Sequence, residues 1–416
     1  RPRFSYSLES DRRNVTLSRA QISVNGWTGD AVGQIAVPYG GAPLKPFTRY
    51  TAALTAVDNA GETAAAALTF ETGRMGTAWA GKWITDAAYR FTGKKDSPLP
   101  MTFRKRFGCG KKVARARICA TAIGIYELEL NGRKVGKDYF APGLTSYEHT
   151  LQYQTYDVTE LLGGENTLLA VVAGGWAVGA FTMNRVNRIT APRQALLAEL
   201  RIAYEDGTEE VFGTDESWEV TEEGRYRYGD FYDGEVYDAA ADLEKADWRQ
   251  AGRETVRIQP ELVATYGNLV RAHEVMRPVS CVRGRSGMLI YDFGQNFAGV
   301  ISAKLRGKAG QVVKFQHTEL LMDGELYLEP LRTAKVSAVY TCTDGEQEYS
   351  PRLTYMGFRY VGVTGIEAGD LELSALALYS DIDGIGAFRC SNPLINRLQE
   401  NIRWSAKSNF MDIPTD

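Results

Sequence analysis

Residues 125–132 read Ile-Tyr-Glu-Leu-Glu-Leu-Asn-Gly, and this stretch decides the fold class. Its apolar residues Tyr126, Leu128 and Leu130 alternate with Glu127 and Glu129. Because successive side chains of a strand point to opposite faces, this period of two predicts a strand with one buried face. The Asn-Gly pair that follows tolerates the positive φ of a tight hairpin turn.

The same combination of strand and turn recurs along most of the chain. Residues 200–204 alternate before Glu205-Asp206-Gly207, and residues 50–57 precede a turn at 58–61 and a second strand ending at Phe70. Gly totals 42, as turn-rich β proteins require. We therefore expect a mostly β fold of tandem antiparallel β-sandwiches up to about residue 388.

The length of the chain and the changes in its sequence pattern indicate several domains. At about 150 residues per domain, 416 residues correspond to about three domains. We expect a first sandwich at 1–74, a second at 75–252, a third at 253–388 and the beginning of a helical domain at 389–416. The polar, alanine-rich stretch 237–252 is expected to connect the second and third sandwiches.

Charge and cysteine content narrow the class of protein. The net charge of -3 argues against a nucleic-acid partner and against a polybasic membrane-surface protein. No apolar run approaches about 18 residues, so no membrane span is expected, and no signal peptide is visible after Arg1. The five cysteines are scattered and odd in number, which favours free thiols and a cytoplasmic location.

The most convincing helix follows Cys390. Ser391-Asn392-Pro393 supplies a capping side chain and then Pro at the first helical position. The apolar residues after it share one face at helical spacing, and they are Leu394, Ile395, Leu398 and Ile402. The helix is expected to end near Asn409. Its stripe needs a partner: either a new helical unit begins here, or the helix packs back on the third sandwich.

Searches for local catalytic and metal motifs fail. There is no phosphate-binding loop, no GxSxG and no HExxH, and the three histidines are far apart. Glu127 and Glu129 share one strand face, which we interpret as the solvated face of a sandwich. The aromatic residues of the stretch 226–237 alternate with Arg225, Arg227 and Asp230. This mixture fits a ligand or interdomain surface, but ordinary edge-strand packing also explains it.

Longer motifs in one consistent order resemble the bacterial α-L-rhamnosidase family of glycoside hydrolases. They cover nearly the whole chain: the stretch 125–136, Ala141-Pro142-Gly143, 153–159, Gly175-Trp176, 292–299, His317-Thr318-Glu319, 331–334, 357–361 and 391–416. The resemblance implies a fibronectin-III-like sandwich, then two jelly-roll-like sandwiches, then the start of an (α/α)6 catalytic barrel. It implies inverting hydrolysis of terminal α-L-rhamnose, in which one carboxylic acid protonates the leaving oxygen and another carboxylate activates water.

The C-terminal residues match the beginning of the family's acidic signature. Pro414-Thr415-Asp416 corresponds to its first three positions, which implies that Asp416 is a substrate-binding carboxylate. The Glu expected as general acid and the later general base would lie beyond Asp416. We therefore expect no catalytic residue among residues 1–416 and no activity of this chain by itself.

The resemblance also suggests where the accessory sandwich would hold sugar. Some accessory sandwiches of the family bind rhamnose through calcium, and Asn131 and the loop after Trp176 are the corresponding places. Ala177 replaces the usual aromatic residue after Gly-Trp, and a hairpin-turn role explains Asn131 equally well. No cofactor is required for hydrolysis, so calcium is the one candidate cofactor.

Two functional hypotheses remain open from the sequence. The first is the N-terminal part of an α-L-rhamnosidase acting on rhamnose-containing glycosides or polysaccharides. The second is a non-catalytic array of carbohydrate-binding sandwiches. Neither hypothesis involves nucleic acid or a membrane, and both are compatible with a homo-oligomer.

Overall fold

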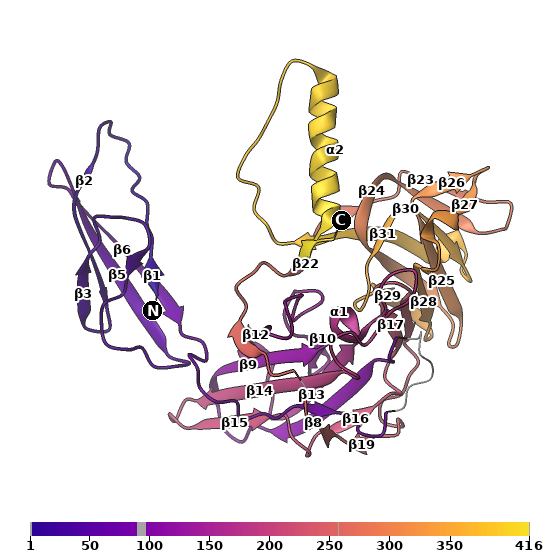
Figure 1. Ribbon diagram of the computed structural model, residues 1–416, viewed down its shortest axis with the longest axis horizontal. Helices are drawn as coiled ribbons and strands as arrows, with labels where there is room; N and C mark the ends of the chain where they lie inside the picture. The colour runs from indigo at the N-terminus through magenta and orange to yellow at the C-terminus, as the bar shows by residue number, and fades with distance from the viewer. Residues whose placement is uncertain (1, 90–96, 257, 416) are drawn as a thin grey trace. The chain divides into compact units, whose positions relative to one another are not determined.

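The computed structural model describes residues 2–89, 97–256 and 258–415, and the chain divides between Ala78 and Trp79 into two compact units. Strands account for nearly half of the described residues and pair mostly antiparallel, as the alternating sequence predicts. Figure 1 gives the labels of the strands and helices used below. Within the described residues, none of the helices combines the length and the apolar character that a membrane span requires.

The first unit is a small sandwich. Its larger sheet has the order β3-β2-β5-β6, with strands Trp27–Asp30, Leu17–Val24, Arg49–Asp58 and Thr63–Glu71. A second pair, β1 (Arg3–Phe4) and β4 (Val37–Pro38), covers it. The core between them contains Ile22, Val24 and Tyr39. The strands expected around the turn at 58–61 are therefore confirmed.

The second sandwich consists of two facing sheets. One has the order β11-β10-β13-β8-β16-β19. Its strands are Arg133–Lys134, Ile125–Leu130, Glu165–Ala173, Met101–Gly108, Glu219–Thr221 and Arg249–Gln250. The other has the order β20-β7-β14-β9-β12-β21, with β15 paired to β14. Its strands are Gly252–Arg253, Ile84–Thr85, Ala195–Tyr204, Val113–Ile123, Thr150–Asp157, Glu261–Ala264 and, for β15, Glu209–Gly213.

The alternating apolar residues of the stretch 125–130 point into this core. Tyr126, Leu128 and Leu130 are at most 3% exposed and pack between the two sheets. After Leu130 the chain turns through Asn131 and Gly132, whose φ values are 54° and 74°. Strand β11 then pairs back onto β10. The hairpin predicted from the sequence is confirmed.

The third sheet has the order β17-β18-β28-β25-β30-β24-β31-β22, and β23 and β29 also pair with β24. Its strands are Tyr226–Asp230, Gly234–Asp238, Ser337–Thr341, Val312–Thr318, Met356–Thr364, Leu289–Gly307, Leu371–Ser380, Val270–Met276, Ser280–Arg283 and Gly345–Tyr349. The long strand β24 shifts register between Asp292 and Phe297. There, Arg359 donates two hydrogen bonds to Asp292, each 2.8 Å long.

Two segments cross the boundary expected at 252/253. The hairpin β17–β18 precedes this boundary, yet β18 pairs in parallel with β28 of the third sheet. Strand β21 follows the boundary, yet it pairs in parallel with β12 of the second sandwich. A buried cluster containing Phe140, Trp176 and Leu353 joins the two sandwiches. The domain ranges stay a prediction, but a cut at residue 252 would separate paired strands.

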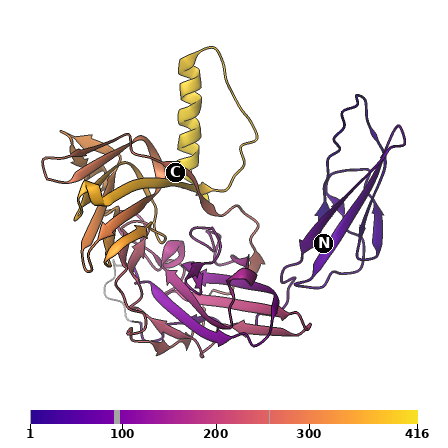
Figure 2. The same cartoon turned by 180° about the vertical axis from the view of Figure 1, so that it is seen from behind.

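Helix α2 (Pro393–Asn409) begins where the sequence predicts. The side chain of Asn392 caps it by accepting a hydrogen bond from the N–H of Leu394 at 2.9 Å. Only its C-terminal end contacts the third sheet, through Trp404, Lys407 and Ser408. Figures 1 and 2 show the rest of the helix projecting away from strands β24 and β31. The helix therefore does not pack its length on the third sandwich.

Several short elements complete the described structure. They are the helix α1 (Gly175–Val178), the strand pairs β26 (Leu320–Met322) with β27 (Glu325–Tyr327) and β32 (Phe410–Met411) with β33 (Ile413–Pro414), and single 3₁₀ turns at Thr159–Leu161, Glu329–Leu331 and Ala368–Asp370.

Candidate functional site

Asn131 lies in the turn between β10 and β11, where its side chain is fully used. Its amide nitrogen donates to the carbonyl of Leu161 at 2.9 Å and to the side chain of Asn166 at 2.8 Å. Its amide oxygen accepts from the N–H of Thr167 at 2.9 Å. These bonds attach the turn to β13 and explain Asn131 structurally. A sugar-binding role for Asn131 stays a prediction.

The loop after Trp176 packs inward. Trp176 lies 4.7 Å from Phe231 between ring centroids, and Ala177 is only 1% exposed. The following loop reaches the tip of the β17–β18 hairpin, where the guanidinium of Arg185 donates to the carboxylate of Asp233 at 2.7 Å. The loop therefore fastens the hairpin to the second sandwich, and Ala177 is not accessible to a ligand.

The expected calcium site is not matched by a cluster of ligand side chains. Within the ranges that the structure describes, no group of three or more His, Cys, Asp and Glu side chains could hold a metal ion. Calcium in the accessory sandwich stays a prediction, and no role below depends on it.

Asp416 lies outside the described residues, but the segment before it is firmly placed. The carboxylate of Asp412 accepts a hydrogen bond from the N–H of Leu144, next to the Ala141-Pro142-Gly143 motif. The N–H of Asp412 donates to Ser380 at 2.9 Å, and Met411 is completely buried. Burial raises the pKa of Asp412, while the hydrogen bond from Leu144 opposes the rise. The β32–β33 hairpin is thus tied to both sandwiches.

Glu127 lies on a covered face and not on a solvated one, which corrects the interpretation from the sequence, and Glu129 on the same face is only partly exposed. The side chain of Glu127 is only 10% exposed. The ammonium of Lys134 lies 2.8 Å from its carboxylate, and the guanidinium of Arg352 lies 3.7 Å from it. Burial raises the pKa of Glu127 to about 7, and Arg352 opposes this rise. The third sandwich covers this face, and the sequence gives no sign of the cover.

Glu235 is a second buried carboxylate at the same interface, and it was not among the candidate residues predicted from the sequence. It accepts hydrogen bonds from the N–H groups of Arg352 and Leu353, both at 2.8 Å, and from the hydroxyl of Tyr349 at 3.0 Å. Burial raises its pKa to about 7, although these three donors oppose the rise. Glu235 follows Gly234 in an ordinary strand pattern, so only the pairing with β28 reveals its burial.

The aromatic residues of the stretch 226–237 lie at the edge of the third sheet, next to the second sandwich. Tyr226 packs on Tyr237 at 4.9 Å between centroids, and Tyr237 is parallel to Tyr340 at 5.8 Å. Phe231 packs on Tyr355 at 5.5 Å. The first two contacts join neighbouring strands, as edge-strand packing predicts, whereas Phe231 lies in the cluster between the sandwiches, as an interdomain role predicts. Together with Glu127, Lys134 and Arg352, this aromatic cluster forms the candidate site.

Family models match the chain in consecutive segments. They are described as a Rha78A-like N-terminal immunoglobulin domain at 1–76, an α-L-rhamnosidase N-terminal domain at 111–282, a bacterial α-L-rhamnosidase concanavalin-like domain at 282–379 and a bacterial α-L-rhamnosidase 6 hairpin glycosidase domain at 383–416.

Curated and solved relatives carry the same description. An α-L-rhamnosidase of Streptomyces avermitilis is 37% identical over 321 residues, which are 74% of this chain and 31% of the relative. The crystal structure of an α-L-rhamnosidase from Aspergillus terreus has a TM-score of 0.90 at 29% identity, covering all of this chain and 51% of that one.

A Streptomyces avermitilis α-L-rhamnosidase in complex with L-rhamnose has a TM-score of 0.87 at 25% identity, covering all of this chain and 59% of that one. The chain therefore spans about a third of the first curated relative and between half and three fifths of these solved chains. The motifs, the fold and these matches agree, and the chain belongs to the bacterial α-L-rhamnosidase family.

Proposed function

We propose that residues 1–416 are the N-terminal part of an enzyme that removes terminal α-L-rhamnose from glycosides or polysaccharides with inversion. The observation that carries the proposal is the order of the four family matches, the last of which is to a glycosidase domain at 383–416. The sandwiches would support a helical barrel that carries the acid and the base. The L-rhamnose bound in the similar Streptomyces structure supports the choice of sugar.

Helix α2 would be the first helix of that barrel. Its apolar stripe is open to solvent: Leu394 is 78% exposed, Leu398 57% and Ile402 52%. Because complete burial of one such side chain contributes about 1.5–3 kcal/mol, an uncovered stripe is a strong reason to pack against further helices. The stripe would then form part of the barrel wall.

The β32–β33 hairpin would position the start of the acidic signature. Asp412 and Met411 fix the hairpin against both sandwiches, and Thr415 donates a hydrogen bond to the carbonyl of Asn409 at 3.0 Å. In this proposal Asp416 hydrogen-bonds rhamnose hydroxyls, while the general acid and base come from further residues of the parent enzyme. Two carboxyl groups spaced to admit a water between them would give inversion.

An assay of two forms of the protein tests this function. Residues 1–416 and the longer parent protein would be incubated with an aryl α-L-rhamnoside, and the anomer released would be followed by proton NMR. We expect turnover only with the longer protein, with β-L-rhamnose as the first product. Turnover by residues 1–416 alone, or none by the longer protein, would contradict the proposal; the latter would favour the non-catalytic carbohydrate-binding array.

A further inference from the structure

A partly open cavity of about 130 Å³ lies between the six-stranded sheet and the β17–β18 hairpin. Glu129 and Lys134 line it from the second sandwich, and Arg225, Tyr226 and Tyr237 line it from the hairpin. A closed cavity of about 150 Å³ holds one benzene ring, so this slightly smaller cavity can take most of a six-membered ring, with the remainder of the ring at its open side. Its open side lets substituents of such a ring reach solvent.

Several polar groups around the cavity lack the partners that they would normally have. Within the described residues, no carboxylate forms an ion pair with Arg225 and no cation forms one with Glu129. The hydroxyl of Thr102, a residue only 3% exposed that also lines the cavity, has no hydrogen-bond partner there. Because an unpaired buried polar group is costly, this arrangement suits a polar occupant.

The two tyrosines add aromatic walls with polar ends. Their rings meet edge to face, with an interplanar angle of 81°. Burial raises the pKa of both Tyr226 and Tyr237, so each hydroxyl keeps its proton and can donate as well as accept. The positive charge of Arg225, which lines the same cavity, opposes the rise in the pKa of Tyr237.

The mixture of donors and acceptors selects the class of occupant. Lys134 and Arg225 only donate, Glu129 only accepts, and the hydroxyls of Thr102 and the tyrosines do both. An apolar ligand would leave these groups unpaired. A small anion could pair with the cations of the lining, Lys134, Arg225 and Arg352, but would leave the carboxylate of Glu129 without a donor. A ring that carries several hydroxyls can pair with both kinds of group, because each hydroxyl donates and accepts.

We propose that this cavity binds one neutral monosaccharide unit between the two sandwiches. The site is built from residues of the two sandwiches and of the segment between them. It would let residues 1–416 hold one sugar residue of a longer carbohydrate.

Calorimetry on residues 1–416 tests the site without any hydrolysis. L-rhamnose, D-galactose and D-glucose would be titrated into the protein, with D-galacturonate as the charged comparison and each run made with and without calcium. We expect saturable 1:1 binding of at least one neutral sugar, independent of calcium. No saturable binding of any neutral sugar, or binding of D-galacturonate alone, would overturn the proposal.

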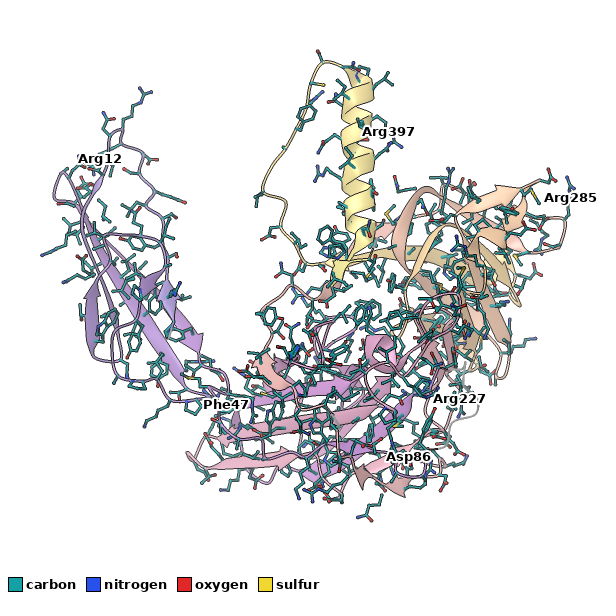
Figure 3. The ribbon with its side chains drawn as sticks, viewed as in Figure 1. Arg12, Phe47, Asp86, Arg227, Arg285 and Arg397 are labelled. Atoms are coloured by element: carbon teal, nitrogen blue, oxygen red, sulfur yellow. The ribbon has the colours of Figure 1, made fainter. Side chains whose placement is uncertain are left out.

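Variants of two neighbouring arginines locate the binding. Arg225→Met removes the donor that lines the cavity, and we expect it to weaken binding at least tenfold. Arg227→Met is the matched control, because Arg227 lies two residues after Arg225, in β17, pairs with Asp238 at 3.2 Å and does not line the cavity; Figure 3 labels it. Binding that survives Arg225→Met, or that falls equally in both variants, would place the sugar elsewhere and overturn the proposal.

Two further variants guard against misfolding of the hairpin. Glu129→Gln keeps the shape of the side chain but weakens the acceptor, and Leu169→Phe fills the cavity from β13 with an apolar ring. Both should reduce sugar affinity at an unchanged thermal unfolding midpoint. Unchanged affinity in both correctly folded variants would contradict the site even if Arg225→Met proved unstable.

Discussion

Two carboxylates at the junction of the second and third sandwiches have unusual pKa values. Glu127 and Glu235 are buried carboxylates whose pKa values are raised to about 7, and each is held by groups from the other sandwich or from a distant strand. At neutral pH these two carboxylates are partly ionised, and their negative charges are less stable in the interface than they would be in water. Protonation of these groups should strengthen the junction.

The pH dependence of stability tests Glu235. Its pKa in the folded protein lies above the unfolded value near 4.5, so the folded state binds more protons between about pH 4.5 and pH 7. The contribution of Glu235 to the free energy of unfolding is therefore fully present below pH 4.5 and is lost as the pH rises towards 7. The loss is on the order of 3 kcal/mol at most. Glu235→Gln should flatten this part of the curve in thermal melts between pH 5 and pH 8.

The matched control for this experiment is Glu372→Gln, since Glu372 is exposed on β31. We expect the control to keep the slope of the natural protein. An identical slope in Glu235→Gln and in the natural protein would show that Glu235 does not titrate in this range.

Asn131 offers a test between a structural and a ligand-binding role. Asn131→Ala removes three side-chain hydrogen bonds and leaves Ala at a φ of 54°, which Ala tolerates less well than Asn. We expect the free energy of unfolding to fall by about 1–3 kcal/mol in urea titrations. Asn131→Gly, which tolerates this φ, should lose less. Unchanged stability together with lost rhamnose binding would instead assign Asn131 to a sugar site.

At the scale of elements, the sequence predicts the local structure well. The strand at 125–130, the turn at Asn131-Gly132 and the helix after Asn392 all appear where period, turn residues and capping residues place them. The sequence does not predict which distant strand pairs with the edge strand of each hairpin. The hairpin β17–β18 pairs with β28, about a hundred residues later, and local patterns carry no information on such a partner.

Helix α2 gives the prediction for this scale. Leu398→Lys with Ile402→Lys changes two exposed side chains, so we expect the thermal midpoint of residues 1–416 to stay within about 1 °C. Trp404→Ala, which removes a side chain packed against the third core, should loosen the helix. In the longer protein the double lysine variant should abolish rhamnosidase activity. A large fall in the midpoint of residues 1–416 would mean that the stripe is already covered.

At the scale of the whole molecule, the chain consists of two units with separate cores. The first core contains residues between Phe4 and Ala56, and the others contain residues from Ile84 onwards. The resemblance and the family matches agree on the order of the modules, whereas the candidate site depends on burial between modules. The site could not be predicted because the sequence pattern around Glu127 is that of a solvent-facing strand residue. Only the packing of the third sandwich, which brings Arg352 close to Glu127, shows that this carboxylate is buried.

Differential scanning calorimetry tests this division. Because each unit has its own core, we expect two unfolding transitions, of which the larger belongs to residues 79–416. Removal of residues 1–78 should delete the smaller transition and leave the midpoint of the larger one unchanged. A single transition, or a marked fall of the remaining midpoint, would show that the two units stabilise each other.

The central claim is that the sandwiches support a helical sugar-cleaving domain that begins with α2. Amide hydrogen exchange of residues 394–402, measured in residues 1–416 and in the longer parent protein, tests it most directly. We predict rapid exchange in residues 1–416, where the apolar stripe is exposed, and at least tenfold slower exchange in the longer protein, where other helices would cover it. Equal exchange rates in the two proteins would contradict the claim.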